Sequence, residues 1–308
     1  MLKIAVVGTG GHSRVHHGIP LSKFKDRVEL AAVCGKDPAS LRSYASEFGF
    51  GRVYDDLDRM IEEVRPDAII VVTPVDVNYP LAKKLIPLRI PLLMEKPPGT
   101  CPAQTAELLS LAESHGTKVM VSFNRRFAPP LLKMADWLKG DTSLKGPFIL
   151  RAKMLRVERA EPEFIQATAV HSLDAIVAFL GAPVEVFARR LPGASANARI
   201  ASMSFADGSL CEFTLNPESG ATQELYEIVG NGFYAEADFI NGVFSSFKRG
   251  VKDASFKTPE GASESEVSGA IGETAHFLDC LEKGLPFGPD LRHGLAVMTL
   301  AETLKAAV

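Results

Sequence analysis

The chain has 308 residues, of which 46% are hydrophobic and 23% are charged, and its formal net charge at pH 7 is −3. This length gives room for two globular domains, and the near-neutral charge provides no strongly basic face, so we expect no nucleic-acid partner. The four cysteines are scattered without a C-x-x-C pair, so we expect no disulfide framework, no bound metal and a cytoplasmic location. The first apolar run is too short for a signal peptide or a membrane span.

Residues 3–13 read Lys-Ile-Ala-Val-Val-Gly-Thr-Gly-Gly-His-Ser. The apolar run 4–7 predicts a parallel strand that is buried on both faces. Gly8 permits a tight turn, Gly10 lets the main chain approach a ligand, and the helix that follows points free N–H groups at the turn, which suits a pyrophosphate. Ser13 stands where the G-x-G-x-x-G motif has its third glycine, and an ordinary strand–helix turn is the alternative. The cofactor contacts predicted here are Gly8, Thr9, Gly10, Gly11, His12 and Ser13.

The second predicted strand, residues 28–33, leads into Cys34-Gly35-Lys36-Asp37. An NAD site usually places a carboxylate at this tip, where it binds the ribose hydroxyls. Here Gly35 takes that place, and Lys36 would attract a ribose 2′-phosphate, so the pattern favours NADP over NAD. Two alternatives stay open: Asp37 bonds the ribose of NAD, or Lys36 is simply solvated.

Strands and helices then alternate up to residue 122, which predicts an α/β domain with a doubly wound parallel sheet. The cofactor of such a sheet lies across the carboxyl ends of its strands, where Thr73, Pro74, Glu95 and Lys96 fall. The expected strands after the second are 53–54, 67–72, 91–94 and 118–122, and the expected helices are 37–48, 57–64, 78–86 and 103–115.

From residue 147 the pattern changes to strands joined by hairpin turns such as Asp207-Gly208 and Asn231-Gly232. It predicts a second, α+β domain with a large, mostly antiparallel open sheet, and sheets of this kind usually find a partner. The domains are expected at residues 1–122 and 123–308. The expected strands are 148–156, 184–191, 199–205, 209–215, 224–230, 233–238 and 243–248; helices are expected at 128–139, 271–283 and 291–306, and a mobile loop at 257–269.

Several motifs stand in one order along the chain: Gly8-Thr9-Gly10, Thr73-Pro74, Glu95-Lys96-Pro97, the run 123–127 (Phe-Asn-Arg-Arg-Phe), and His171 with Asp174. In this ordered set the chain resembles the glucose–fructose oxidoreductase / inositol dehydrogenase (Gfo/Idh/MocA) family. The resemblance implies a dehydrogenase that uses NAD or NADP on sugars, polyols or related small molecules. It also implies a Rossmann domain, an α+β substrate domain, and a homodimer or homotetramer formed through the second sheet.

By the same resemblance, Lys96 lies near the nicotinamide and the substrate, where its positive charge can polarise or protonate the reacting oxygen. Glu95 is implied as a cofactor-side contact, and Asn124 as a contact on the nicotinamide side. Asn78 falls where the family often has a histidine, so that cofactor contact is expected to be altered. For Arg125 and Arg126 two possibilities stay open: they hold an anionic or hydroxyl-rich substrate, or they pair with acids across the domain junction. Lys153, Arg156, Glu158 and Arg159 are pocket candidates, with a solvated charged loop as their default.

The catalytic segment departs from the family pattern. The family has an aspartate four residues before its histidine, but here Ala167 stands four residues before His171. His171 can still exchange a proton near neutral pH, and Asp174, three residues further on, can orient its ring or hold the substrate. We therefore predict Lys96 and His171 as the catalytic pair. The alternatives are a dinucleotide-binding sensor without turnover and, with no specific support, the family's hydrolytic branch, which cleaves glycosides with tightly held NAD.

Overall fold

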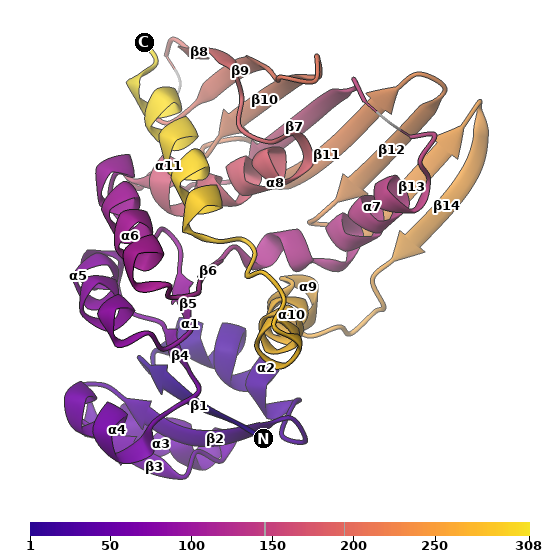
Figure 1. Ribbon diagram of the computed structural model, residues 1–308. Coiled ribbons are helices and arrows are strands. Elements are labelled where there is room, and N and C mark those ends of the chain that lie inside the picture. Colours follow the sequence, from indigo (N-terminus) through magenta and orange to yellow (C-terminus); the bar gives the residue numbers. More distant parts are fainter. Residues whose placement is uncertain (145, 194) are drawn as a thin grey trace. The chain divides into compact units, whose positions relative to one another are not determined.

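The computed structural model describes residues 1–144, 146–193 and 195–308. The chain divides into two compact units, coloured along the sequence in Figure 1. The first unit comprises Met1–Asn124 and Ala270–Leu295, and the second comprises Arg125–Gly269 and Ala296–Val308. The predicted domains, 1–122 and 123–308, differ from these units at residues 123–124 and 270–295, which we expected in the second domain.

The return of residues 270–295 to the first unit has a packing cause. Helix α10 (Ala270–Lys283) contacts α2 (Ile19–Ser22), and the side chain of Arg27 pairs with Asp279 and Glu282 of α10. Ser122 also donates a hydrogen bond of 2.8 Å to Glu273. These partners are more than 100 residues apart, so local sequence patterns do not reveal them.

The first unit is built on a parallel sheet with the strand order β3-β2-β1-β4-β5-β6, the order of a Rossmann fold. The strands are β1 (Leu2–Val7), β2 (Val28–Cys34), β3 (Arg52–Tyr54), β4 (Ala68–Val71), β5 (Leu92–Glu95) and β6 (Val119–Ser122). Besides α2 and α10, its helical segments are α1 (Gly11–Ser13), a π-helix at Arg14–Gly18, α3 (Pro38–Phe48), α4 (Leu57–Val64), α5 (Val75–Leu85), a 3₁₀ turn at Ile86–Leu88 and α6 (Pro102–His115). The predicted α/β fold of this half is confirmed.

Local chemistry explains where these elements begin and end. The run Ile4–Val7 is buried in the middle of the sheet, as expected for a strand covered on both faces. Asp37 caps α3 by accepting hydrogen bonds from two main-chain N–H groups, and Gly49 ends that helix with a φ of +90°. Helix α5 begins at Val75 and not at Asn78 as predicted, which places Asn78 in its first turns.

The second unit is built on a sheet with the order β14-β13-β12-β11-β7-β10-β9-β8, in which only the β7–β10 pairing among the described strands is parallel. Its strands are β7 (Ile149–Leu155), β8 (Glu185–Arg190), β9 (Arg199–Ser204), β10 (Leu210–Asn216), β11 (Gln223–Gly230), β12 (Phe233–Asp238), β13 (Val243–Lys248) and β14 (Val251–Lys257). Its helical segments are α7 (Pro129–Gly140), a π-helix at Ile165–Ala169, α8 (Val170–Leu180), α9 (Glu264–Val267) and the part of α11 (Leu291–Ala306) from residue 296 on. The large, mostly antiparallel sheet is confirmed.

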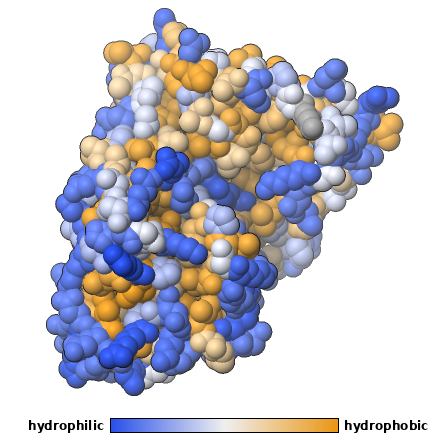
Figure 2. All heavy atoms as spheres, viewed as in Figure 1, coloured by the Kyte–Doolittle hydropathy of each residue, from blue (hydrophilic) through white to orange (hydrophobic). Residues whose placement is uncertain are grey.

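Helices α7 and α8 cover one face of this sheet, α7 over β12–β14 and α8 over β7 (Figure 1). Along β9 and β10, buried residues alternate with exposed ones, so the other face stays open. Apolar side chains remain at the surface of the second unit in Figure 2. None of the helices in the described part of the chain combines the length and the apolar character that crossing a bilayer requires.

The expected elements of the second unit do not include β14, α9 or the helical run formed by the π-helix Ile165–Ala169 and α8. Strand β14 follows a tight turn at Arg249-Gly250, where both residues have positive φ, and it is an edge strand with mostly exposed side chains. The sequence of β14 does not alternate between apolar and polar residues as a half-buried strand does, because an edge strand with exposed side chains does not need this alternation. Helix α9 lies inside the expected loop 257–269. Its capping box between Ser263 and Glu266 was a signal in the sequence that the prediction missed.

Candidate active site

The glycine turn after β1 leaves room for a ligand. Gly8 has a φ of +102°, and a Cβ on it would lie 1.9 Å from the carbonyl oxygen of Val72, so the turn itself requires glycine. A Cβ on Gly10 or Gly11 would meet no described atom within 4 Å, although helix α1 begins at Gly11. This space in front of free helical N–H groups fits the pyrophosphate of a dinucleotide.

Thr9 and Ser13 face inward and not toward this space. The Thr9 hydroxyl lies 2.9 Å from the Ser40 hydroxyl, which also donates to the Thr9 carbonyl. Ser13 is buried, with its hydroxyl 3.0 Å from that of Tyr44. Position 13 therefore serves the close helix–strand packing for which the third glycine of the motif is used.

At the tip of β2, the two candidate ribose contacts, Lys36 and Asp37, have different surroundings in the structure. Gly35 lies beside Thr9, and Lys36 is exposed. The carboxylate of Asp37 accepts hydrogen bonds from the N–H groups of Ala39 (3.2 Å) and Ser40 (3.1 Å), as the cap of α3. Of the two, Lys36 is the one whose charged group is not used to cap the helix.

Glu95, at the end of β5, joins this turn to the predicted catalytic lysine. Its Oε1 accepts hydrogen bonds from Nε2 of His12 (3.0 Å) and Nε2 of His17 (2.8 Å), and its Oε2 accepts one from the main-chain N–H of Lys96 (3.2 Å). Burial would raise the pKa of Glu95, but the hydrogen bonds and charges of His12 and His17 outweigh it and hold the pKa well below its usual range. The carboxylate is thus ionised and committed to the two histidines.

His16 completes a histidine cluster (His12, His16 and His17) around this carboxylate. Its ring lies against that of His12, tilted by 37°, with the centroids 4.2 Å apart. Burial first, and then the charges of His12 and His17, lower the pKa of His16 to about 4, against the opposing effect of Glu95. His12 is half-exposed and can meet a ligand at the turn, whereas His17 is buried, and its Nδ1 has no hydrogen-bond partner among the described residues.

The main chain at the end of β5 is held from the other side by Asn78. The Asn78 amide donates to the carbonyl of Glu95 (2.7 Å) and, more weakly, to that of Pro97 (3.4 Å), while its Oδ1 accepts from the Thr73 hydroxyl (3.0 Å). Asn78 is fully buried, so it supports the strand end and does not line an open surface. Lys96 follows this fixed point and is half-buried, and Pro74, which caps α5, is exposed.

In the second unit, His171 and Asp174 lie on α8 and are both buried. The Asp174 carboxylate accepts hydrogen bonds from Nε (3.1 Å) and Nη2 of Arg126, a two-point pairing that fixes both side chains. Of the two possibilities for Arg126, the structure shows the pairing with an acid. Asp174 is committed to this arginine, which leaves less of it for the predicted contact with a substrate.

Arg125 pairs with a different buried acid, Glu224 of β11, through Nη1 at 2.8 Å. Arg156 donates to the same Oε2 of Glu224, so two guanidinium groups share one carboxylate. The hydroxyl of Tyr226 donates a 3.0 Å hydrogen bond to the other Glu224 oxygen and lies 3.0 Å from the hydroxyl of Ser172, the neighbour of His171. Arg156 was expected by default to lie in a charged loop exposed to solvent, and this is wrong because Arg156 is buried.

Ala167, where the family has its aspartate, lies in the π-helix Ile165–Ala169 directly before α8. Its main-chain N–H donates to the carbonyl of Glu163 (2.8 Å). The neighbouring Gln166 and Thr168 are buried, and Thr168 accepts a long hydrogen bond from Arg159 (3.4 Å). The described segment Ile165–Ala169 itself contains no carboxylate in place of the missing aspartate.

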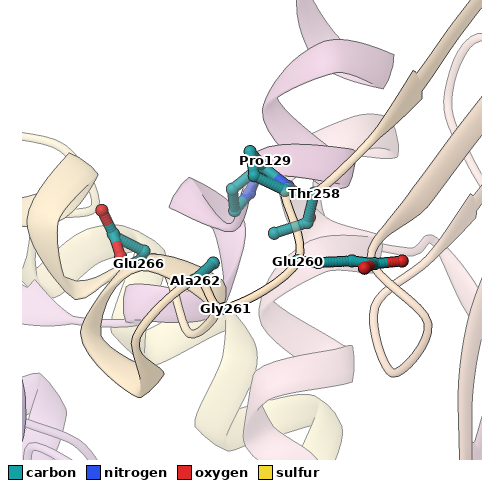
Figure 3. Close-up of a pocket in the computed structure, with 7 residues that line it drawn as sticks. Pro129, Thr258, Glu260, Gly261, Ala262 and Glu266 are labelled. Atoms are coloured by element: carbon teal, nitrogen blue, oxygen red, sulfur yellow. The ribbon is translucent and has the colours of Figure 1, made fainter.

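A pocket of about 400 Å³ in the second unit is lined by Pro129 of α7, the segment 258–262 and Glu266 of α9 (Figure 3). Its described lining contains none of the predicted site residues. The carboxylates of Glu260 and Glu266 point in opposite directions in Figure 3, so they do not converge on a ligand. Within the described residues, no group of three or more His, Cys, Asp or Glu side chains is arranged to hold a metal ion.

The prediction did not include His16, His17, Glu224 or Tyr226. His16 and His17 follow His12 by four and five residues on one helical run, so each of them lies about one helical turn from His12. In the alternating strand β11, Glu224 and Tyr226 fall on the same face as the buried Ile228. An acid on the apolar face of a strand is a sequence signal for a buried ion pair.

Comparisons with known proteins agree with this geometry. Residues 2–123 match the sequence model of the GFO_IDH_MocA family, described as "Oxidoreductase family, NAD-binding Rossmann fold". The chain is 28% identical to the D-glucoside 3-dehydrogenase of Escherichia coli strain K12 over 127 residues, 41% of this chain and 36% of that protein. With three of the curated relatives that it matches, the chain spans only 56%, 43% and 36% of their length.

Solved structures with the same fold cover nearly the whole chain. UDP-N-acetylglucosamine 3-dehydrogenase GnnA from Acidithiobacillus ferrooxidans matches with a TM-score of 0.83 at 20% identity, over 100% of this chain and 97% of that one. An oxidoreductase from Agrobacterium radiobacter, solved with NAD⁺, L-tartaric acid and magnesium, matches with a TM-score of 0.82 at 18% identity, over 98% and 94%. Over residues 2–123 the chain is similar to the Gfo/Idh/MocA family of oxidoreductases, and this segment matches the NAD-binding Rossmann fold of that family.

Proposed function

We propose that this chain is an NAD(P)-dependent dehydrogenase or reductase that acts on a sugar, a polyol or a related hydroxyl or carbonyl compound. The observation that carries the proposal is the hydrogen bond between His12, beside the glycine turn, and Glu95, which directly precedes Lys96. It joins the predicted pyrophosphate site and the predicted catalytic lysine in one site. The names of two similar proteins, a D-glucoside 3-dehydrogenase and a UDP-N-acetylglucosamine 3-dehydrogenase, support the sugar class.

In the proposed reaction, a bound nicotinamide would supply or accept the hydride at a substrate carbon. The Lys96 ammonium group stabilises negative charge that develops on the substrate oxygen. His171 takes the hydroxyl proton during oxidation and returns it during reduction. Glu95 and Asn78 hold the strand end from which Lys96 projects, and the paired Arg126 and Asp174 hold α8, which carries His171.

The test is coenzyme oxidation or reduction followed at 340 nm with a panel of sugars, polyols and keto compounds. We expect Lys96→Met and His171→Ala each to lower kcat/KM by about 10²- to 10⁴-fold, the usual contribution of a positioned proton donor or acceptor. Lys84→Met is the control, because Lys84 is an exposed lysine paired with Asp58. A rate in either variant equal to that of the wild type would remove that residue from the mechanism.

We also propose NADP as the preferred coenzyme. The support is the exposed Lys36 at the tip of β2, together with the use of Asp37 as a helix cap. The NAD⁺ named in the complex of a similar structure supports the alternative. Lys36→Asp should weaken NADPH binding far more than NADH binding, as measured by quenching of protein fluorescence. Equal losses for both coenzymes would contradict the preference.

A second candidate function is a dinucleotide-binding sensor without turnover. The observation that favours it is Ala167, which leaves the catalytic segment without its aspartate. The same assay separates the two candidates: tight NADPH binding with no change at 340 nm for any compound would favour the sensor. Replacing Ala167 with aspartate is a further check, because it should raise turnover only in an enzyme that lacks this proton acceptor.

Three further proposals follow from the fold and the composition. Residues 1–122 are the dinucleotide-binding domain, and residues 123–308 carry the substrate and oligomer contacts, apart from the segment that packs with the first unit. The chain forms a homodimer or homotetramer through the open face of the second sheet, which exposes apolar side chains. A cytoplasmic location is supported by the four cysteines, all of them free thiols.

A further inference from the structure

The second unit contains an arginine cluster, which we define as Arg125, Arg156 and Arg159. The cluster lies where β7 ends and β11 begins, and Arg125 is the first residue of the unit. Its central acid is Glu224, which is fully buried and accepts hydrogen bonds from both Arg125 and Arg156. These groups all belong to the second unit, so the cluster is defined within one compact body.

The charges of this cluster do not balance among the described residues. Glu224 serves two arginines, and Arg159 pairs with Glu161 through a hydrogen bond of 2.9 Å from Nε. Tyr226 adds no negative charge, because burial and the adjacent Glu224 carboxylate raise its pKa well above 10. The nearby pair of Arg126 and Asp174 is neutral by itself. Three guanidinium groups therefore meet two carboxylates in the described part of the unit.

The two arginines on Glu224 are used differently. Arg156 donates to the carbonyls of Leu155 (2.9 Å) and Gln223 (3.0 Å) as well as to Glu224, so it links two strands of the sheet. Arg125 makes one hydrogen bond within the described residues, from Nη1, and its guanidinium lies over the ring of Phe239 at 5.1 Å. The remaining N–H donors of Arg125 are available to a ligand, and 19% of its side chain is exposed.

An unbalanced positive charge in a largely buried place is costly unless a counter-charge arrives with a ligand. Burial lowers the pKa of Arg125, which Glu224 opposes and the charge of Arg156 reinforces. A guanidinium group keeps its proton even so, so the excess charge persists. Its planar donors match two oxygens of a carboxylate or of a phosphoryl group.

We propose that Arg125 binds an anionic group of the substrate, a carboxylate or a phosphoryl group, so that the substrate is an acidic or phosphorylated sugar or polyol and not a neutral one. The inference rests on the proposed function for the substrate class. It selects Arg125 over Arg126, whose guanidinium already has two-point pairing with Asp174.

The experiment is isothermal titration of the protein, saturated with NADPH or NADH, with five probes: D-glucuronate, D-gluconate, D-glucose 6-phosphate, D-glucose and myo-inositol. We expect at least one acidic probe to bind about 10- to 100-fold more tightly than either neutral probe, the range of one charge-assisted hydrogen-bonding group. The two sugar acids and the sugar phosphate distinguish a carboxylate from a phosphoryl ligand.

Variants assign the effect to one residue. Arg125→Met should remove the advantage of the acidic probe and change the affinity for neutral probes by less than about twofold, since Arg156 still pairs with Glu224. Arg125→Lys should restore part of the advantage, because it keeps the charge and loses the planar fork. Arg151→Gln is the matched control. Arg151 lies on β7, the strand that Arg156 directly follows, but Arg151 is exposed and pairs with Glu212.

Three results would overturn the inference: no acidic probe binds, a neutral probe binds as tightly as the best acid, or Arg125→Met leaves the preference intact. If circular dichroism shows that Arg125→Met does not fold, the inference is still tested by the affinities of the wild type for acidic and neutral probes and by the affinities of Arg125→Lys for the same probes. Failure of the proposed function is a separate outcome, seen as absence of coenzyme binding and of any change at 340 nm. Binding of the acid is measured as heat and does not require turnover.

Discussion

Gly8 and Gly10 stand two residues apart in the same turn and meet different constraints. At Gly8 the main chain has a φ of +102° and passes against the Val72 carbonyl, so the fold needs glycine there. At Gly10 the main chain has ordinary angles, φ −70° and ψ 176°, and an added Cβ would enter open space. The described fold therefore does not require glycine at position 10, whereas a pyrophosphate bound in that space would.

This contrast gives a paired prediction. Gly8→Ala should lower the free energy of unfolding by about 3 kcal/mol or more, because it combines a clash with a strained φ. Gly10→Ala should leave that free energy within about 0.5 kcal/mol and weaken coenzyme binding at least tenfold. Urea denaturation and fluorescence titration measure the two effects. Full coenzyme affinity in Gly10→Ala would show that the turn does not hold the pyrophosphate.

His16 gives a prediction for the pH dependence of stability. An unfolded histidine binds a proton near pH 6.5, whereas in the fold the pKa of His16 is lowered to about 4. Between these values the unfolded state holds more protons, so the free energy of unfolding falls as the pH is lowered through this window, by about 3 kcal/mol at most.

Urea denaturation at pH 7.5 and at pH 4.5 measures this loss, and His16→Gln should reduce it because the substituted side chain does not titrate. His115→Gln, on the last turn of α6, controls for the loss of a histidine elsewhere in the same unit. Protonation of the Glu95 carboxylate also lowers the free energy of unfolding as the pH falls, but at lower pH than His16, because the pKa of Glu95 is depressed below the ordinary carboxyl range. An unchanged loss in His16→Gln would contradict the assignment.

At the scale of elements, the end of β5 is held on both sides before the chain reaches Lys96. On one side the Glu95 side chain is bound by histidines of the helical run that follows the glycine turn, and on the other Asn78 of α5 binds the Glu95 carbonyl. A strand end fixed in this way positions the next residue more precisely than a loop does. Both described π-helices, Arg14–Gly18 and Ile165–Ala169, also adjoin predicted site residues, as such segments often do.

Asn78 is therefore predicted to be a positioning residue. Asn78→Leu should lower kcat about 10-fold or more, leave KM for the coenzyme within about threefold, and lower stability by about 1 to 3 kcal/mol, because the Glu95 carbonyl loses its partner. Asn78→His, which restores a donor, should recover part of kcat. A fall in stability with no change in kcat would show that Asn78 supports only the fold.

Most elements were predictable because their signals are local. The buried strands of the first unit are continuous apolar runs, and α3 and α4 carry their caps, Asp37 and Asp56, directly before them. Strand β14 could not be found this way, since its side chains are mostly exposed and its partner strand, not its own pattern, keeps it in place.

At the scale of the whole molecule, the second sheet presents an open face that a monomer would leave exposed to water. Phe187 of β8 and Ile200 of β9 are 62% and 60% exposed, and Leu210 of β10 is 48% exposed. Phe187 pairs with Ser202, two residues after Ile200, and Leu210 pairs with Ser204, so these side chains share one face. Exposed apolar patches of this kind mark contact surfaces between proteins.

We expect light scattering to give two or four times the mass of one chain. The double variant Phe187→Glu with Ile200→Glu should give a monomer, because buried carboxylates without partners are costly in an interface. Leu88→Glu is the control, since Leu88 is a 45% exposed apolar residue of the first unit. A monomeric wild type, or a double variant of unchanged mass, would contradict the proposal.

The sequence by itself determined the parallel sheet and the glycine turn after β1, because each depends on residues that are close together in the chain, and it indicated the resemblance to the Gfo/Idh/MocA family through motifs that stand in order between residues 8 and 174. Only the tertiary structure decided which groups the residues of these motifs meet: Glu95 bonds His17, 78 residues away, and Arg126 bonds Asp174, 48 residues away. It also decided that two arginines share Glu224 and that α10 returns to the first unit. The physical reason is that such partners are chosen by packing, and packing brings together residues whose spacing along the chain carries no information about their contact.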